Sequence, residues 1–253
     1  MKSIKVTLGL LKTLVDDQEE VSVHDISRKI GFSKSTTHRA LQALEEEGFA
    51  VKNPESKHYK YGPQLLDLAF NFIIHFNLRN IAQVFLRRLA DEVNENIYLC
   101  VYSDHSLYFI DMFESTHPIR YVNPMGRRRY LHAGAAGKVV LAYLPMVERE
   151  KFLQAGLPRF TPNTITKPES LRYDLDRIMK QGYAFSEGEF SPGGVAIAVP
   201  ILDLEAYPVG CVNIVIPENR FEMQGKERLI KLLQKAAKTI QDRFNEAGGG
   251  ILS

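Results

Sequence analysis

Residues 22–48 contain the pattern that most constrains the fold, which is a pair of short helical segments separated by a three-residue turn. Ser22 is placed to cap a helix over residues 23–30, Gly31 to end it, and Ser33 to cap a second helix beginning at Lys34. A serine hydroxyl accepts a hydrogen bond from a free N–H at a helix start, and glycine adopts the left-handed conformation that ends many helices. Two helices joined by a glycine-containing turn predict a helix-turn-helix.

The segments on either side extend this prediction to a winged helix. The upstream segment forms a helix whose apolar positions Leu8, Leu11, Leu14 and Val15 have helical spacing. Downstream, FAVKN, the turn PESK and HYKY predict a two-stranded hairpin with a basic tip. A helix-turn-helix followed by such a hairpin is the arrangement of a winged-helix domain.

The second of the two capped helices has an outward face suited to DNA. Thr37, Ala40, Leu41 and Leu44 fall on one side of a helical wheel, and its outward face carries no acid in its first half. The N-terminal half of such a helix meets base edges in the major groove, where arginine can bind guanine, while flanking cations bind phosphates. The alternative is a solvated amphipathic helix. The candidate DNA-binding residues are Arg28, Lys34, Ser35, Thr36, Thr37, His38, Arg39 and Lys57.

Beyond Gly62 and Pro63 the pattern changes from short helices to strands. Residues 64–76 predict a connecting helix, and residues 96–103, 107–113, 118–122, 184–187, 194–202 and 208–216 predict strands. Hairpinned strands with helices between them predict an antiparallel sheet covered by helices, so the fold class is α+β. The expected division is a winged helix over 1–62, a linker helix over 63–78 and a second domain over 79–253.

Composition sets limits on localisation and partners. The 253 residues contain no run of about 18 apolar residues and no cleavable leader, so we expect a cytoplasmic protein without membrane contact. The net charge of +2 is too small to indicate nucleic-acid binding by itself, so that function depends on local clustering. Cys100 and Cys211 lie in apolar strand-like runs and are expected to be buried thiols.

The run HAGAAGKVVLAYL, residues 132–144, resembles a phosphate-binding loop only superficially. Gly134 and Gly137 are too close together for that motif, and Val139 replaces the required hydroxyl. Two interpretations remain. In the first, the small residues form a cradle in which free N–H groups at a helix start meet a ligand; in the second, they only permit tight packing.

Catalytic and metal-binding groups are not expected. His132 has no partner at ligand spacing, and Glu187 and Glu189 are expected to be surface acids. No motif combines a nucleophile, a base and an orienting group. We therefore expect no enzyme, no metal and no other cofactor.

Three separated motifs resemble one known family. The run ISRKIGFSKSTTHRALQALEEEGFAVKN is similar to the DNA-binding half of the IclR family of bacterial transcription regulators. HAGAAGKVVLA and GYAFSEGEFSPGGVAIAVPI resemble its effector-binding half, in the same order. The resemblance implies an N-terminal winged helix, a linker helix and a C-terminal GAF-like sensor, assembled as a homodimer or a dimer of dimers on a palindromic double-stranded DNA operator.

The resemblance also implies where a small-molecule effector binds. The candidate effector-binding residues are Gly134, Ala135, Ala136, Ser186, Gly194 and Ala196. An organic acid is a candidate effector, but some members that bind small organic acids carry Asp at the position of Ser186 and Cys at that of Ala196. These departures argue against an identical effector.

The predicted function is ligand-responsive transcription regulation. The alternative is a metabolite-binding protein or enzyme whose winged helix makes protein contacts. Binding to duplex DNA that weakens steeply with salt distinguishes the first from the second.

Overall fold

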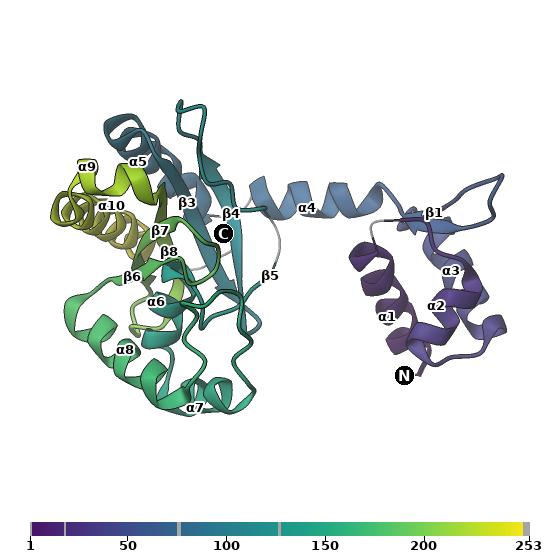
Figure 1. The fold of residues 1–253 in the computed structure, drawn as a ribbon. Helices are drawn as coiled ribbons and strands as arrows, with labels where there is room; N and C mark the ends of the chain where they lie inside the picture. Colours follow the sequence, from purple (N-terminus) through teal and green to yellow (C-terminus); the bar gives the residue numbers. More distant parts are fainter. Residues whose placement is uncertain (1, 18, 75–76, 126–127, 250–253) are drawn as a thin grey trace. The chain divides into compact units, whose positions relative to one another are not determined.

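The computed structural model describes residues 2–17, 19–74, 77–125 and 128–249, and it divides the chain into two compact units, residues 1–75 and 76–253 (Figure 1). The order and the type of most elements follow the sequence expectations. No helix in these described ranges is long and apolar enough to cross a membrane.

The first unit is a small helical domain with a β-hairpin. Its elements are α1 (Lys2–Asp16), α2 (Val23–Ile30), α3 (Lys34–Glu46), β1 (Ala50–Lys52), β2 (Tyr59–Tyr61) and α4 (Gln64–Ile74). The predicted caps are confirmed: Ser22 accepts from Asp25 N, Ser33 accepts from Thr36 N, and Gly31 ends α2 with φ 70°. The hairpin gains a third extended segment, because Val21 and Tyr59 exchange backbone hydrogen bonds of 2.8 and 2.9 Å.

The inward face of α1 differs from the expected one. Val6, Leu10 and Leu14 are buried against α3, whereas Leu8 and Val15 are exposed. The buried positions are spaced i, i+4 and i+8, so they form a stripe along one side of the helix. Several apolar residues of this segment are near one another on the helix, and the sequence pattern did not determine which of them face the core.

The second unit is a six-stranded antiparallel sheet between two layers of helices. Its strands run in the order β5-β4-β3-β8-β7-β6. Their bounds are β3 (Asn96–Ser103), β4 (Ser106–Phe113), β5 (Arg128–Arg129), β6 (Ala184–Glu187), β7 (Gly194–Leu202) and β8 (Pro208–Pro217). The helices are α5 (Asn77–Val93), α6 (Ala135–Tyr143), α7 (Met146–Gln154), α8 (Pro168–Gln181), α9 (Glu218–Gln224) and α10 (Lys226–Glu246).

Alternation along the central strands produces a core on each face of this sheet. Ile97, Leu99 and Val101 pack with α5 and α10, while Tyr98 and Cys100 face α6 and α8. Figure 1 shows α5, α9 and α10 on one side of the sheet and α6, α7 and α8 on the other. Both faces of the central strands are buried, which explains why these strands are almost continuously apolar. The expectation of buried thiols is confirmed, since Cys100 and Cys211 are both buried and free.

The predicted strand over residues 118–122 is wrong. This segment follows an irregular path, and the strand that pairs with β4 is β5. Side chains from β3 hold the segment in place of a ladder: Asn96 Nδ2 and the Tyr98 hydroxyl donate to Tyr121 O, at 2.6 and 3.2 Å, and Asn123 N donates to the Tyr98 hydroxyl. Side-chain hydrogen bonds satisfy the backbone here without strand pairing.

Candidate functional site

The helix α3 presents the polar face expected of a DNA-contacting helix. Lys34, Ser35 and Arg39 are exposed, and Thr36 and His38 are half-buried. The Ser33 hydroxyl caps the helix and lies 2.8 Å from the Thr36 hydroxyl. The N-terminal half of α3 therefore combines exposed cations, hydroxyls and the positive end of a helix dipole.

Thr37 does not belong to this face, so its assignment as a DNA-binding residue is wrong. Its exposed fraction is 0%, and it lies on the buried side of α3 with Leu41 and Leu44. Its hydroxyl has no hydrogen-bond partner within the described ranges. A side chain enclosed by its own domain cannot reach a base or a phosphate.

Two flanking cations remain available at the surface. The Arg28 side chain is 76% exposed, and its contact with Asp25 is a surface ion pair of 3.3 Å. Lys57, at the tip of the hairpin with φ 58°, is exposed, and its Nζ donates to Pro54 O at 2.6 Å. Exposed contacts of this kind contribute little to stability, so a phosphate can replace them at small cost.

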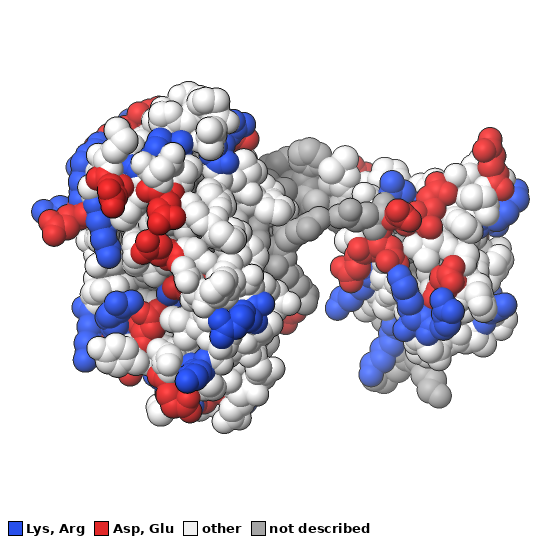
Figure 2. Space-filling model, in the orientation of Figure 1, with Lys and Arg blue, Asp and Glu red and all other residues white. Residues whose placement is uncertain are grey.

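Charge on the first unit is mixed. Figure 2 shows lysine and arginine side chains interspersed with acidic ones on the face of the unit that it draws. DNA affinity therefore depends on which cations surround the N-terminal half of α3, and the net charge of the chain does not decide it.

In the second unit, one cavity collects all six candidate effector residues. Gly134, Ala135 and Ala136 come from the start of α6, Ser186 from β6, and Gly194 and Ala196 from β7. The cavity has a volume of about 70 Å³. A buried water needs roughly 10–15 Å³ by a comparable measure, so the cavity fits a small molecule. The structure brings these residues together, and their role in effector binding stays a prediction.

The backbone at the start of α6 offers hydrogen-bond donors to this cavity. The first helical hydrogen bond runs from Lys138 N to Gly134 O at 3.2 Å. The N–H groups of Ala135, Ala136 and Gly137 precede that bond and therefore have no acceptor within the helix. Because all three residues line the cavity, a ligand with an acceptor group can meet these donors.

The turn before α6 has features of both interpretations, the ligand cradle and tight packing. A Cβ on Gly137 would lie 2.5 Å from Tyr130 O, so this glycine is required by close packing. Gly134 has φ 83°, which disfavours other residues, yet its Cβ would meet only Phe190 at 3.8 Å. Ala135 and Ala136 are buried and border the cavity directly.

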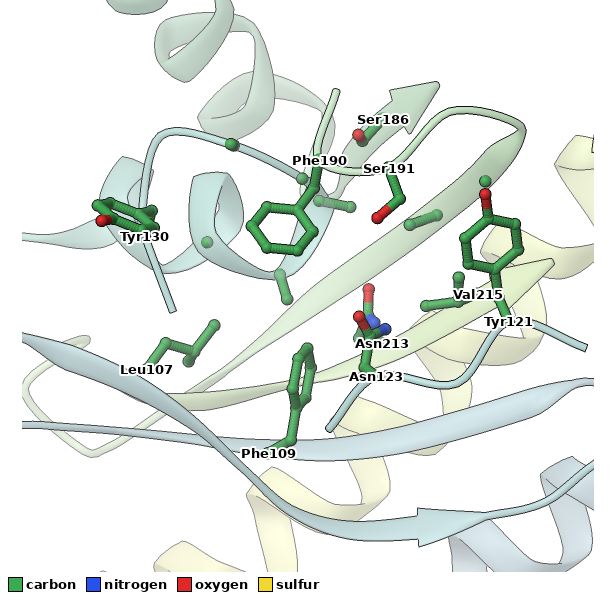
Figure 3. A pocket seen from close by; sticks show the side chains of 17 residues that line it. Leu107, Phe109, Tyr121, Asn123, Tyr130, Ser186, Phe190, Ser191, Asn213 and Val215 are labelled. Atoms are coloured by element: carbon green, nitrogen blue, oxygen red, sulfur yellow. The ribbon is translucent and has the colours of Figure 1, made fainter. Parts of the chain in front are cut away.

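Several lining residues were not identified as candidates from the sequence. Figure 3 shows Phe109, Phe190, Asn123, Asn213 and Ser191 around the cavity. Tyr121, for which the sequence leaves open a place in a pocket wall or in the core of a strand, lines the cavity and donates its hydroxyl to Pro192 O. None of the described lining residues carries a charge. The wall is thus aromatic and apolar with a few neutral polar groups, as in many small-molecule sites.

A buried cluster of charges lies behind the cavity. Lys138, which is 1% exposed, contacts Asp174 at 2.8 Å, the Phe185 carbonyl oxygen at 3.0 Å, and Glu189. Glu189 Oε2 also accepts from Gly134 N at 3.2 Å, so this carboxylate connects the loop after β6 to the start of α6. Burial raises the pKa of Glu189, and the nearby Lys138 ammonium opposes that change.

The expectation that Glu189 is a surface acid is therefore wrong, whereas Glu187 is exposed as expected. Glu189 is buried because Lys138 is buried. The residues on either side of Lys138 in α6 are also buried, and a buried ammonium group needs carboxylate partners.

His132 is buried, and its ring packs in a cluster of aromatic side chains. Its Nε2 lies 2.8 Å from Pro158 O, and its ring packs near Phe160. Burial lowers the pKa of His132, which favours the neutral ring. No group of three or more His, Cys, Asp or Glu residues with metal-binding geometry occurs in the part of the chain described.

Two family models match the chain. The IclR helix-turn-helix domain matches residues 3–54, and the bacterial transcriptional regulator IclR C-terminal model matches residues 70–242. The HTH-type transcriptional regulator KdgR of Dickeya chrysanthemi is 30% identical over 245 residues, which cover 96% of this chain and 80% of KdgR.

Solved structures agree with this match. The IclR protein of Thermotoga maritima has a TM-score of 0.71 and 30% identity, and the alignment covers 97% of this chain and 99% of that one. An IclR homolog from Microbacterium hydrocarbonoxydans, complexed with 4-hydroxybenzoate, has a TM-score of 0.79 with 24% identity, covering 95% of this chain and 99% of that one.

Proposed function

The chain belongs to the IclR family and is a DNA-binding, ligand-responsive transcriptional regulator. We propose that the exposed N-terminal half of α3 contacts base edges in the major groove of a palindromic operator. The observation that carries this proposal is a capped helix whose first half has no acidic residue and on which Arg39 is exposed. Arginine on such a surface can donate two hydrogen bonds to guanine. Proteins matched to this chain are regulators, and no catalytic role is proposed for any residue.

The remaining candidate residues position the domain on DNA. The proposed phosphate and base contacts come from Arg28, Lys34, Ser35, Thr36, His38, Arg39 and Lys57. Lysine and arginine side chains that neutralise phosphates supply affinity for any sequence, whereas groove contacts supply discrimination. The wing and α2 therefore contribute general affinity, and α3 contributes specificity.

The second part of the proposal concerns the cavity beside α6. A small organic acid places its carboxylate against the N–H groups of Ala135 and Ala136, while Ser186, Gly194 and Ala196 form the facing wall. Helix N-termini favour anions because unpaired N–H groups and the helix dipole point toward them. The homolog complexed with 4-hydroxybenzoate shows that one protein of this fold accepts an acid of that kind.

Each of the two units has its own proposed role. We propose a winged helix over residues 1–62, a linker helix over 63–78 and an effector-binding domain over 79–253, acting in the cytoplasm as a homodimer or a dimer of dimers. The effector changes transcription only if it binds the DNA-competent and DNA-incompetent arrangements with different affinity.

Selection of bound fragments from genomic DNA, followed by binding to the selected duplex at increasing salt, tests the proposal. We expect a defined palindromic sequence, and an affinity for it that falls steeply with salt. Selection of no common sequence, together with salt-independent binding, would favour a winged helix that contacts other proteins.

A further inference from the structure

An acid from outside the hairpin holds the loop between β1 and β2. Glu20 directly precedes the extended segment that pairs with β2. Its carboxylate accepts from Asn53 Nδ2 at 2.8 and 3.0 Å and from the Ser56 hydroxyl at 2.9 Å. Both donors belong to residues 53–58, which we call the wing tip. One carboxylate therefore connects two points of this loop to the body of the domain.

The same two side chains use their remaining polar atoms within the wing tip. Asn53 Oδ1 accepts from Glu55 N at 2.9 Å and from Ser56 N at 3.2 Å, and Ser56 Oγ accepts from His58 N at 3.3 Å. Lys57 lies between these anchored residues with φ 58°, a backbone conformation that lysine rarely adopts. The contacts of Glu20 thus fix the side chains that hold the backbone on both sides of Lys57.

Local hydrogen bonds determine the shape of the wing tip. Figure 1 shows the loop extending beyond the helices of the first unit, and residues 54–57 are exposed. A loop that buries little apolar surface opens easily unless its own polar groups restrain it. Glu20 is the restraint that comes from outside the hairpin.

The carboxylate of Glu20 has two opposite effects on DNA binding. Hydrogen bonds from Asn53 and Ser56 keep the pKa of Glu20 below its ordinary value, so its carboxylate is ionised at neutral pH. A negative charge within about 8 Å of a phosphate is only partly screened at physiological salt and repels it. A wing tip that is already ordered, by contrast, loses less conformational entropy when Lys57 meets a phosphate.

We propose that Glu20 is a positioning residue for DNA binding, and that its hydrogen bonds to Asn53 and Ser56 raise the affinity for DNA although its charge is negative. This inference rests on the proposed phosphate contact of Lys57. Glu20 itself touches no DNA and acts through the wing tip.

Fluorescence anisotropy of the full chain with a labelled duplex of random sequence tests the inference, because phosphate contacts do not depend on sequence. Glu20→Ala should weaken binding about threefold to tenfold, the scale of ordering one long side chain on binding. It should also reduce the salt slope by about 1, as for the loss of one phosphate contact. Glu20→Gln keeps an oxygen acceptor without the charge and should bind at least as tightly as the parent.

Two controls separate positioning from charge. Glu19→Ala removes the same charge from the neighbouring exposed residue, while the wing-tip donors stay with Glu20. This variant should bind the duplex at least as tightly as the parent. In a Lys57→Ala background, Glu20→Ala should cause no further weakening, because the residue through which it acts is absent.

A third control separates positioning from folding. The melting temperature of Glu20→Ala should stay near the parent's, because exposed polar contacts contribute little to stability. If this variant melts early, Ser56→Ala takes its place, since it removes one donor at the wing tip and should weaken binding in the same way.

Each failure has its own meaning. If Lys57→Ala leaves binding to the random duplex unchanged, the proposed phosphate contact fails and this inference fails with it. If Lys57→Ala weakens binding but Glu20→Ala binds as tightly as Glu19→Ala, only the inference is overturned, because the charge is then the larger effect. Equal weakening by Glu20→Gln and Glu20→Ala, or an undiminished effect of Glu20→Ala in the Lys57→Ala background, overturns it as well.

Discussion

Replacing Lys138 by methionine should destabilise the second unit by about 3–5 kcal/mol at pH 7.5, the range found when one partner of a buried ion pair is removed. Methionine keeps most of the apolar stem, so the change removes chiefly the ammonium group. Asp174 keeps Arg177 as a partner, whereas among the described residues the Glu189 carboxylate keeps only the Gly134 N–H. The penalty should therefore concentrate on Glu189, and Glu189→Gln in the Lys138→Met background should recover about 1–3 kcal/mol.

The pH dependence of the Lys138→Met variant gives an independent test. Burial already raises the pKa of Glu189, and loss of the ammonium group that lowers it should raise that pKa further. In the unfolded chain a glutamate has a pKa of about 4.3. At pH values between this unfolded-state pKa and the raised folded-state pKa of Glu189, the folded state binds more protons than the unfolded state. The free energy of unfolding then falls as pH rises through the folded-state pKa and increases as pH falls through it.

Urea unfolding followed by circular dichroism suits this chain, which has no tryptophan. Measurements at pH 7.5 and 5.5 should show the variant recovering stability relative to the parent at the lower pH. The reasoning is refuted if Lys138→Met lies within about 1 kcal/mol of the parent at pH 7.5, or if its deficit grows at pH 5.5.

Three further variants test the DNA interface and the turn before α6. Arg39→Ala should weaken operator binding by about 1–3 kcal/mol and random duplex far less, as measured by fluorescence anisotropy; an equal loss on both would exclude base contact. Lys57→Ala should weaken binding to all duplexes alike and reduce the salt slope by about 1, and an unchanged slope would contradict a phosphate contact. Ala135→Leu should abolish the response to an effector while operator affinity and melting temperature stay near the parent's. A variant that melts early would instead indicate overpacking, which typically costs about 1–3 kcal/mol.

Local signals explain what the sequence predicted well. The caps at Ser22 and Ser33 and the turn at Gly31 involve groups within a few residues of each other, and the structure contains all three. The outward positions of α3 follow from helical geometry alone, so Arg39 and Ser35 are exposed as expected. Thr37 is the exception among the candidates, because the helical wheel places it with Leu41 and Leu44 and it is buried there.

Long-range contacts account for what could not be predicted. Asn213 belongs to an almost uniformly apolar strand, and only the position of the cavity distinguishes it from a core amide. Tyr121 was assigned to a strand because its neighbours have strand propensity. The hydrogen bonds that hold its backbone come from Asn96 and Tyr98, more than twenty residues earlier in the chain.

At Lys138 the sequence predicts that a carboxylate partner exists but not which residue supplies it. A lysine followed by VVLAY in a helix beginning with small residues is surrounded by core positions, so its charge needs carboxylate partners. The sequence therefore contains evidence that a buried acid exists. Its identity depends on the packing of α8 and the loop after β6, which place Asp174 and Glu189 beside a residue that is 36 and 51 positions away in the chain. Glu189 and Glu187 are separated by one residue and chemically identical, and only the tertiary fold determines which of the two carboxylates joins Lys138.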